Sequence, residues 1–172
     1  MSSDPGFRRA HIEDAATLAS FWRDRYVDTF GTLYRKQDLE AFLAESYDPA
    51  RIASEISDPG FVHVLVEGQE GLRAALKGGR ATLPLDDIAA LWELHRLYLT
   101  PASKGTGLAD ALMDFATEQA KTAHASALVL GVFSENHRAL RFYARHGFRQ
   151  IGSYTFMVGQ HRDHEFIMRK DI

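Results

Sequence analysis

Residues 93–109 contain the most promising combination of chemically useful side chains in the sequence. Glu93 and His95 lie two positions apart in a run of leucine and aromatic residues that is typical of a buried strand. Side chains two apart in a strand point to the same face, so this carboxylate and imidazole can act together on a proton. Lys104 and two glycines follow, and a periodic helix begins near Gly107. A glycine turn before a helix N-terminus can bind an anion through its backbone N–H groups.

Each of these features also has an ordinary structural interpretation. A Gly-x-Gly pair between a strand and a helix is more often a simple connection, and the sequence matches neither the P-loop nor the dinucleotide-binding fingerprint here. Glu93 can be a paired strand carboxylate, and His95 can be a structural histidine. Further motifs are needed to decide between the two interpretations.

Hydrophobic periodicity predicts the elements that position these side chains. We expect an α/β (α+β) fold with a mixed sheet and antiparallel early strands, built as a single domain over residues 1–172 with residues 1–6 as a flexible lead. Residues 78–87 are expected to form a loop, and residues 159–163 the turn of a final hairpin. The predicted strands are 7–12, 61–67, 72–77, 91–99, 127–132, 148–158 and 165–169, and the predicted helices are 12–30, 37–47, 49–57, 107–122 and 136–145.

Composition excludes several classes of protein. The chain has 172 residues, 45% of them hydrophobic, and a net charge of −3, which argues against a nucleic-acid partner because phosphate binding needs a basic surplus. There are no cysteines, so disulfides and thiolate chemistry are excluded. No apolar run suggests a signal peptide or a membrane span, so we expect a cytoplasmic protein. His161 and His164 form the only histidine pair with short spacing, and we expect no metal site.

Two motifs together resemble the GNAT acetyltransferase superfamily. The stretch Lys104-Gly105-Thr106-Gly107-Leu108-Ala109 is similar to its acyl-CoA signature, Gln/Arg-x-x-Gly-x-Gly/Ala, with a lysine at the first position and an alanine at the last. The stretch from Asn136 to Phe148 resembles its closing motif, Asn-x-x-Ala-x-x-Phe-Tyr-x-x-x-Gly-Phe. The resemblance implies a mostly antiparallel seven-stranded sheet flanked by helices, with a splayed central strand pair that forms the acyl-CoA cleft.

The same resemblance implies roles for individual residues. Tyr143 would protonate the leaving thiolate, although a Phe-Tyr pair in an apolar helix is usually part of the core. Glu93 would be the base for the amine, and His95 would take or relay its proton. Acceptor specificity is expected near Tyr26, Phe30 and Tyr34. The expected acetyl-CoA contacts are the main chain of Leu97, Tyr98 and Leu99, the turn Lys104, Gly105, Thr106, Gly107, Leu108 and Ala109, and Val132, Asn136, Ala139, Tyr143 and Arg145.

A narrower similarity concerns the acceptor. Asp28-Thr29-Phe30, the strand at residues 93–98 and the tail around residues 154–159 resemble the bacterial spermidine/spermine N-acetyltransferase branch, which makes a polyamine the first expectation. His95 stands where that branch often has a carboxylate. Amino acids, antibiotics and protein N-termini are the alternative acceptors, and a non-catalytic acyl-CoA-binding module is the alternative without turnover. We expect a small-molecule amine substrate, no metal, no nucleic acid, no membrane, and a monomer or homodimer.

Overall fold

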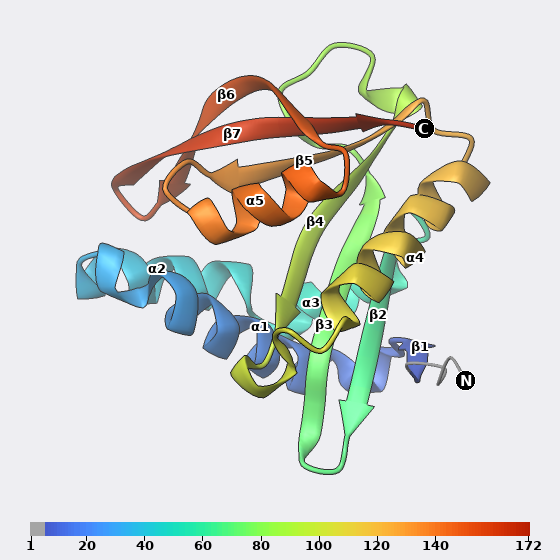
Figure 1. Ribbon diagram of the computed structural model, residues 1–172. Helices are drawn as coiled ribbons and strands as arrows, with labels where there is room; N and C mark the ends of the chain where they lie inside the picture. Colours follow the sequence, from blue (N-terminus) through green and yellow to red (C-terminus); the bar gives the residue numbers. More distant parts are fainter. Residues whose placement is uncertain (1–5) are drawn as a thin grey trace.

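The computed structural model describes residues 6–172 (Figure 1). The flexible lead expected over residues 1–6 falls outside this range except for Gly6. The amino-terminal part contains a short strand and three helices, β1 (Phe7–Arg9), α1 (Ala15–Phe30), α2 (Lys36–Ser46) and α3 (Pro49–Ser57). Asp48 caps α3, with its carboxylate accepting a hydrogen bond from the Ala50 N–H at 3.2 Å, as a helix N-cap does. No helix in residues 6–172 is long and apolar enough to cross a membrane.

The remaining strands complete one seven-stranded sheet in the order β1-β2-β3-β4-β5-β7-β6. Every neighbouring pair is antiparallel except β4 and β5, which are parallel. This mixed, mostly antiparallel sheet confirms the predicted fold class. The elements are β2 (Phe61–Gly68), β3 (Gly71–Arg80), β4 (Leu91–Leu99), α4 (Leu108–Thr122), β5 (Ala127–Phe133), α5 (His137–Arg145), β6 (Arg149–Val158) and β7 (His161–Asp171).

The parallel pair at the centre of the sheet opens into a V. Strands β4 and β5 pair only from Leu91 opposite Ala127 to Glu93 opposite Val129. Beyond Glu93 they diverge: β4 continues along β3, while β5 continues along β7 (Figure 1). The diverging ends leave main-chain groups of both strands available inside the sheet. The splayed strand pair expected from the sequence is therefore present, and Glu93 lies at its vertex.

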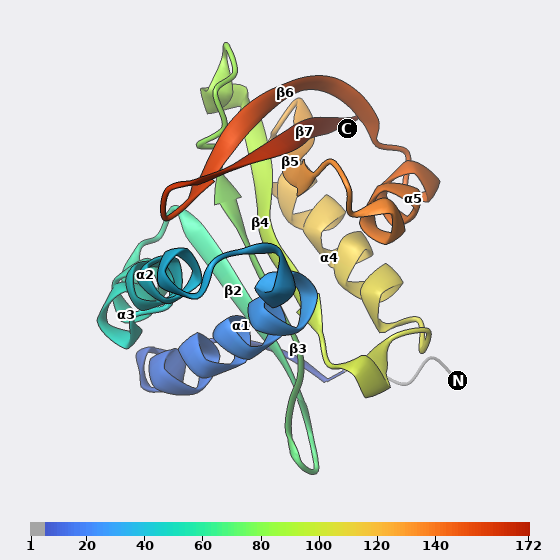
Figure 2. The same cartoon turned by 90° about the vertical axis from the view of Figure 1, so that its left-hand side faces the viewer.

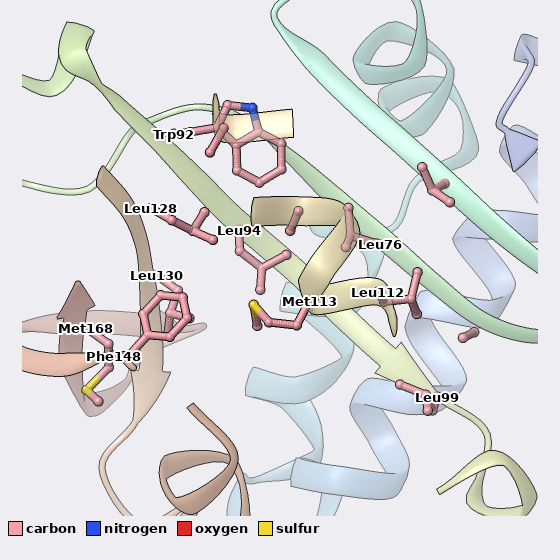
Figure 3. Packing of buried hydrophobic residues seen from close by; sticks show 14 of the residues in the cluster. Leu76, Trp92, Leu94, Leu99, Leu112, Met113, Leu128, Leu130, Phe148 and Met168 are labelled. Atoms are coloured by element: carbon pink, nitrogen blue, oxygen red, sulfur yellow. The ribbon is translucent and has the colours of Figure 1, made fainter. Parts of the chain in front are cut away.

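Helices cover both faces of the sheet (Figure 2). On one face, α4 packs on Leu76, Leu94 and Leu128 through Leu112 and Met113 (Figure 3). On the other face, α1, α2 and α3 pack on β2, β3 and β6, and the side chains of Leu18, Trp22 and Ile52 are fully buried there. These two apolar layers hold the sheet rigidly, and α5 lies beside α4 at the open end of the V.

Two predicted loops are shorter than expected, because strand residues occupy part of each. Strand β3 continues through Gly78 and Gly79 to Arg80, where the sequence predicted a loop. The two glycines are needed for close packing, because a Cβ on Gly78 would lie 1.9 Å from the Trp92 ring and a Cβ on Gly79 would lie 2.1 Å from the Gly60 carbonyl oxygen. The final hairpin turn is also tighter than predicted.

In that hairpin, Val158 pairs directly with His161, so residues 161–163 belong to β7 rather than to the turn. Gly159 allows the tight turn because its φ of +57° is in the left-handed region. As a consequence, Asp163 points inward and is only 4% exposed. Across the V, the side chain of Asp163 accepts a hydrogen bond from the Tyr34 hydroxyl.

Candidate active site

A single cavity of about 1400 Å³ fills the V between β4 and β5 and extends to both faces of the sheet. Main chain and side chains of β4 line it from Glu93 to Leu99, and β5 contributes Gly131 to Phe133. The turn before α4 and the helix α5 line one end, while α1, α2, α3 and β7 line the other. Its volume exceeds the roughly 300–1,000 Å³ that is typical of a pocket for one small ligand.

The turn before α4 has the geometry of an anion site. Gly105 and Gly107 have φ angles of +77° and +84°, and a Cβ built on either would meet no atom of residues 6–172 within 4 Å. The turn is therefore open to solvent at both glycines, and the first N–H groups of α4 lie beside it without intrahelical acceptors. Lys104 and Ala109 also line the cavity.

Two residues of the predicted turn site direct their side chains elsewhere. The Thr106 hydroxyl donates to the Ser103 carbonyl oxygen at 2.7 Å, which holds the turn closed on itself. The Leu108 side chain is 5% exposed and belongs to the core under α4. Only the main chain of these two residues can therefore face a ligand.

Helix α5 contributes a row of cations and a tyrosine. Asn136 caps the helix by accepting a hydrogen bond from the Ala139 N–H at 3.2 Å, and both residues line the cavity. Arg145 also lines it and pairs with Asp110 of α4 at 2.7 Å. Arg138 and Arg141 lie on the same wall. The sequence interpretation did not include these two arginines, although Arg138, Arg141 and Arg145 follow one another at spacings of three and four, which is typical of one helical face.

Tyr143 lies on the cavity wall between its core neighbours and the open space. Its ring packs edge-on against Phe142 and Phe148, at centroid distances of 5.5 and 5.7 Å. Burial raises the pKa of the Tyr143 hydroxyl to about 12. The hydroxyl is therefore protonated at neutral pH and can donate to an anion that forms beside it. The Tyr143 ring packs against the core and also lines the cavity, and its role as the acid stays a prediction.

Glu93 and His95 form a contact pair at the vertex. Glu93 Oε2 accepts hydrogen bonds from the Thr82 N–H at 2.6 Å and the Thr82 hydroxyl at 3.2 Å. His95 Nδ1 lies 3.2 Å from Glu93 Oε1, and His95 Nε2 lies 3.0 Å from the Arg80 carbonyl oxygen. Burial raises the pKa of Glu93, but His95 and Thr82 together outweigh burial, so the pKa is below its ordinary value. Glu93 is ionised at neutral pH.

A register shift between β3 and β4 brings His95 into this position. Lys77 lies opposite Arg96, and Gly78 lies opposite Leu94, so His95 is an extra residue on β4. Such a bulge re-aims the side chains around it. Here it places both Glu93 and Arg96 on the side of the sheet covered by α1 to α3, since Arg96 lies over the Trp22 ring at 5.8 Å.

A second carboxylate that the sequence did not single out faces the vertex. Glu165 of β7 accepts a hydrogen bond from the Tyr154 hydroxyl at 2.7 Å. Both groups lie over Gly131 of β5, where a Cβ would be 2.4 Å from the Tyr154 oxygen and 3.1 Å from Glu165 Oε2. Burial raises the pKa of Glu165. A glutamate at the start of an apolar strand was the available signal for Glu165, and a glycine inside a buried strand was the signal for Gly131.

The predicted acceptor residues lie together at the far end. Tyr26, Phe30 and Tyr34 line the cavity, with the Tyr26 hydroxyl donating to the Tyr34 hydroxyl at 3.3 Å. Tyr26 and Tyr34 are 6% and 9% exposed, so they also form the core between α1 and α2. Of the residues singled out from the sequence, all but Thr106 and Leu108 line this one cavity. No three histidine, aspartate or glutamate side chains gather as metal ligands within residues 6–172.

A seven-stranded sheet that opens at one parallel pair, with a glycine turn and a helix N-terminus at the opening, is the architecture of GNAT-type acetyltransferases. The solved structure of PaiA N-acetyltransferase from Thermoplasma acidophilum, in complex with coenzyme A, superposes with a TM-score of 0.77 at 22% identity, covering 96% of this chain and 98% of that one. The sequence pattern of the Acetyltransferase (GNAT) family matches residues 22–148. The chain belongs to this family and is an acetyltransferase.

Relatives in sequence agree with this assignment. An uncharacterised N-acetyltransferase of Lactobacillus delbrueckii subsp. lactis is 29% identical over 92% of each chain. An uncharacterised N-acetyltransferase of Mycobacterium bovis is 32% identical over 79% of this chain and 83% of that protein. A spermidine N(1)-acetyltransferase of Thermoplasma acidophilum is 26% identical over 83% and 86%. Family members transfer an acetyl group from acetyl-CoA to an amine.

Proposed function

We propose that this chain transfers the acetyl group of acetyl-CoA to the primary amine of a small molecule by direct attack. One observation carries the proposal. The turn before α4, Tyr143 and Glu93 all border the same cavity. A donor and an acceptor that enter from opposite ends would therefore meet beside Glu93.

Acetyl-CoA fits the end of the cavity at α4 and α5. The open turn at Gly105 and Gly107 and the N-terminus of α4 would hold the pyrophosphate. Lys104, Arg138 and Arg145 supply positive charge for the phosphates. The main chain of Leu97 to Leu99, where β4 has left β5, would pair with the amides of the pantetheine arm. Val132, Asn136 and Ala139 would form the opposite wall.

The thioester supplies an activated acetyl carbonyl, and side chains of this protein would accept and donate the protons. Glu93 is ionised and would take a proton from the incoming ammonium, directly or through water. The free amine forms a bond from nitrogen to the carbonyl carbon, and the bond from carbon to sulfur breaks. The Tyr143 hydroxyl would protonate the departing thiolate, and the second proton, which the amide nitrogen releases, would pass through water to restore the Tyr143 hydroxyl. The products are an N-acetylated amine and coenzyme A.

We assign His95 a positioning role rather than the relay role expected from the sequence. Both of its ring nitrogens face acceptors, the Arg80 carbonyl oxygen and the Glu93 carboxylate. With both ring nitrogens occupied by these contacts, neither is free to accept a proton from the amine. In this arrangement His95 holds the Glu93 carboxylate in place and favours its ionised form.

A polyamine is the first acceptor to test. Its support is the resemblance of residues 93–98 and 154–159 to the spermidine/spermine branch and the relative named spermidine N(1)-acetyltransferase. Glu93, Asp163 and Glu165 would attract a cationic substrate to the vertex. Amino acids, antibiotic amines and protein N-termini are the other acceptors to include. A single cytoplasmic domain that acts as a monomer or homodimer remains our prediction.

Release of coenzyme A from acetyl-CoA in the presence of an amine panel tests the proposal. The panel contains putrescine, spermidine, amino acids, aminoglycosides and short peptides, and free thiol is measured against an amine-free blank. We expect release that depends on amine with at least one class. Binding of acetyl-CoA without release for any amine would instead indicate an acyl-CoA-binding module, and the absence of binding by calorimetry would refute the assignment of the cleft.

A further inference from the structure

A second charged group lies in the same cavity, away from the vertex. We call it the basic ring, and it consists of Arg51, Lys77 and Arg96 around two carboxylates, Glu45 and Glu55. Glu55 Oε2 lies 2.9 Å from Lys77 Nζ and 3.3 Å from Arg96 Nη1. Arg51 Nε lies 3.5 Å from Glu55 Oε1, and Arg51 Nη1 lies 3.9 Å from Glu45 Oε1. All five residues line the cavity.

The inner part of the basic ring is buried and carries more positive than negative charge. The side chains of Lys77 and Arg96 are 7% and 15% exposed, and they share the single carboxylate of Glu55, which is 13% exposed. Glu45, the other carboxylate, is 83% exposed and reaches only Arg51 at the rim. Burial and the charge of Arg96 lower the pKa of Lys77, which is the response expected where cations crowd together.

Aromatic rings hold the inner cations from their other sides. Arg96 lies over the Tyr47 ring at 5.1 Å, and Lys77 Nζ lies over the Phe61 ring at 4.4 Å. Ring faces attract cations and fix their positions, but they carry no net charge. A buried positive excess that faces a cavity is costly unless an anion enters to balance it. The side chains are thus preorganised for a negatively charged group.

We propose that the basic ring is a subsite for a carboxylate or another acidic group of the acceptor, so that the preferred substrate is an amine that also bears an anion. This inference rests on the proposed function and narrows it. The acceptor's amine would lie at Glu93 and Glu165, and its acidic end at Lys77 and Arg96. Such a substrate matches both ends of the cavity, whereas a polyamine matches only the acidic end.

The spacing along β4 sets the length of the acceptor. Glu93 and Arg96 are three residues apart on the same strand and face the same side, which corresponds to roughly 10 Å of extended chain, less the shortening at the bulge. An amine and an acid on adjacent atoms cannot reach both groups. The two charges of the acceptor should therefore be separated by several bonds.

Three amines of equal length test the proposal. Hexylamine, 6-aminohexanoate and cadaverine each carry a primary amine on five methylenes, followed by a methyl, a carboxylate or an ammonium group. We expect kcat/KM for 6-aminohexanoate to exceed that for hexylamine at least tenfold and to exceed that for cadaverine by more. Equal values, or a preference for cadaverine, would overturn the subsite while leaving the acetyltransferase proposal intact. No release with any amine would refute the proposed function itself.

Two variants with opposite expected effects distinguish the role of side-chain charge from a general loss of packing. Arg96→Gln removes a cation from the basic ring, and we expect the ratio of kcat/KM for 6-aminohexanoate over hexylamine to fall tenfold or more. Glu55→Gln removes the competing carboxylate, and we expect this ratio to rise. A general loss of packing would lower kcat/KM for both amines. It would not raise the ratio in one variant and lower it in the other. A ratio that is unchanged in both variants, or that moves the same way in both, would refute the subsite.

Matched controls accompany these variants. Lys36→Gln removes the same charge from an 87% exposed side chain outside the cavity and should leave the ratio unchanged. Where Arg96→Gln fails to fold, Arg51→Gln replaces it, because the Arg51 side chain is 48% exposed and tolerates the change. We expect Arg51→Gln to lower the ratio about threefold, and an unchanged ratio would count against the proposal.

Discussion

Replacing Glu93 by glutamine tests the assignment of the base most directly. Glutamine has the same shape, and its carbonyl oxygen can still accept the hydrogen bonds that Thr82 donates at 2.6 and 3.2 Å. It cannot take a proton, and it carries no charge opposite His95, whose Nδ1 lies 3.2 Å from the carboxylate in the native protein. The variant therefore removes the proton acceptor and its negative charge while keeping the packing.

Two magnitudes follow from these contacts. Loss of a general base lowers kcat/KM by about 10²- to 10⁴-fold. Loss of one charge-assisted hydrogen bond at a buried site costs about 1.5–3 kcal/mol, which lowers Tm by roughly 3–12 °C in a chain of this size. Because the folded-state pKa of Glu93 is lowered, its contribution to stability is present above the unfolded-state pKa. The Tm difference should disappear as the pH falls through the folded-state pKa.

Rates of coenzyme A release from about pH 3 to pH 9, a range that extends below the ordinary carboxylate pKa, and thermal unfolding at acid and neutral pH measure both effects. Glu118→Gln is the matched control, because this carboxylate is 66% exposed and pairs with Lys121 on the surface. A Glu93→Gln enzyme that works within about threefold of the native rate at every pH would refute the assignment. His95→Gln should shift the acid limb of the pH–rate profile to higher pH, since the Glu93 pKa rises without the imidazole.

Three further substitutions test other parts of the site. Tyr143→Phe keeps the ring contact with Phe148 and removes the proton donor. We expect kcat to fall by about 10²-fold or more with little change in Tm, and normal turnover would exclude the acid role. Gly107→Ala strains a residue at φ +84° by about 1 kcal/mol and narrows the turn. We expect KM for acetyl-CoA to rise roughly tenfold, and an unchanged KM would argue against a phosphate site. Gly78→Ala places a Cβ 1.9 Å from the Trp92 ring. We expect the free energy of unfolding, measured in urea, to fall by about 1–3 kcal/mol, and native stability would mean that β3 and β4 can separate at this point.

Local signals explain which parts of the fold were predictable. The strand from Leu91 to Leu99 and the start of α4 follow from apolar periodicity and the glycine turn, and the structure has them at the predicted residues. The start of α5 follows from the capping side chain of Asn136. These signals lie within a few residues of the element that they specify. The prediction failed at Gly78 and Gly79, where the reason for the glycines is a Trp92 ring and a Gly60 carbonyl group that approach from other segments.

The contacts within the site were only partly predictable from the sequence, because several of them come from segments that are distant along the chain. Periodicity indicated that Glu93 and His95 share a face, but the hydrogen bonds from Thr82 and to the Arg80 carbonyl oxygen come from across the sheet. Those contacts favour the ionised form of Glu93 and occupy both ring nitrogens of His95. The second carboxylate, Glu165, reaches the vertex only because β7 pairs with β5 rather than with β4.

The sequence by itself indicated the family, the cleft and some of the residues that border it, because the two motifs and the order of elements can be recognised along the chain. The tertiary structure alone decided which charges meet. Glu55, Lys77 and Arg96 come from a helix and two strands, and no local pattern relates them. Through-space neighbours set the ionisation and partners of a buried charge, so the basic ring and the acceptor that it favours emerge only once the chain is folded.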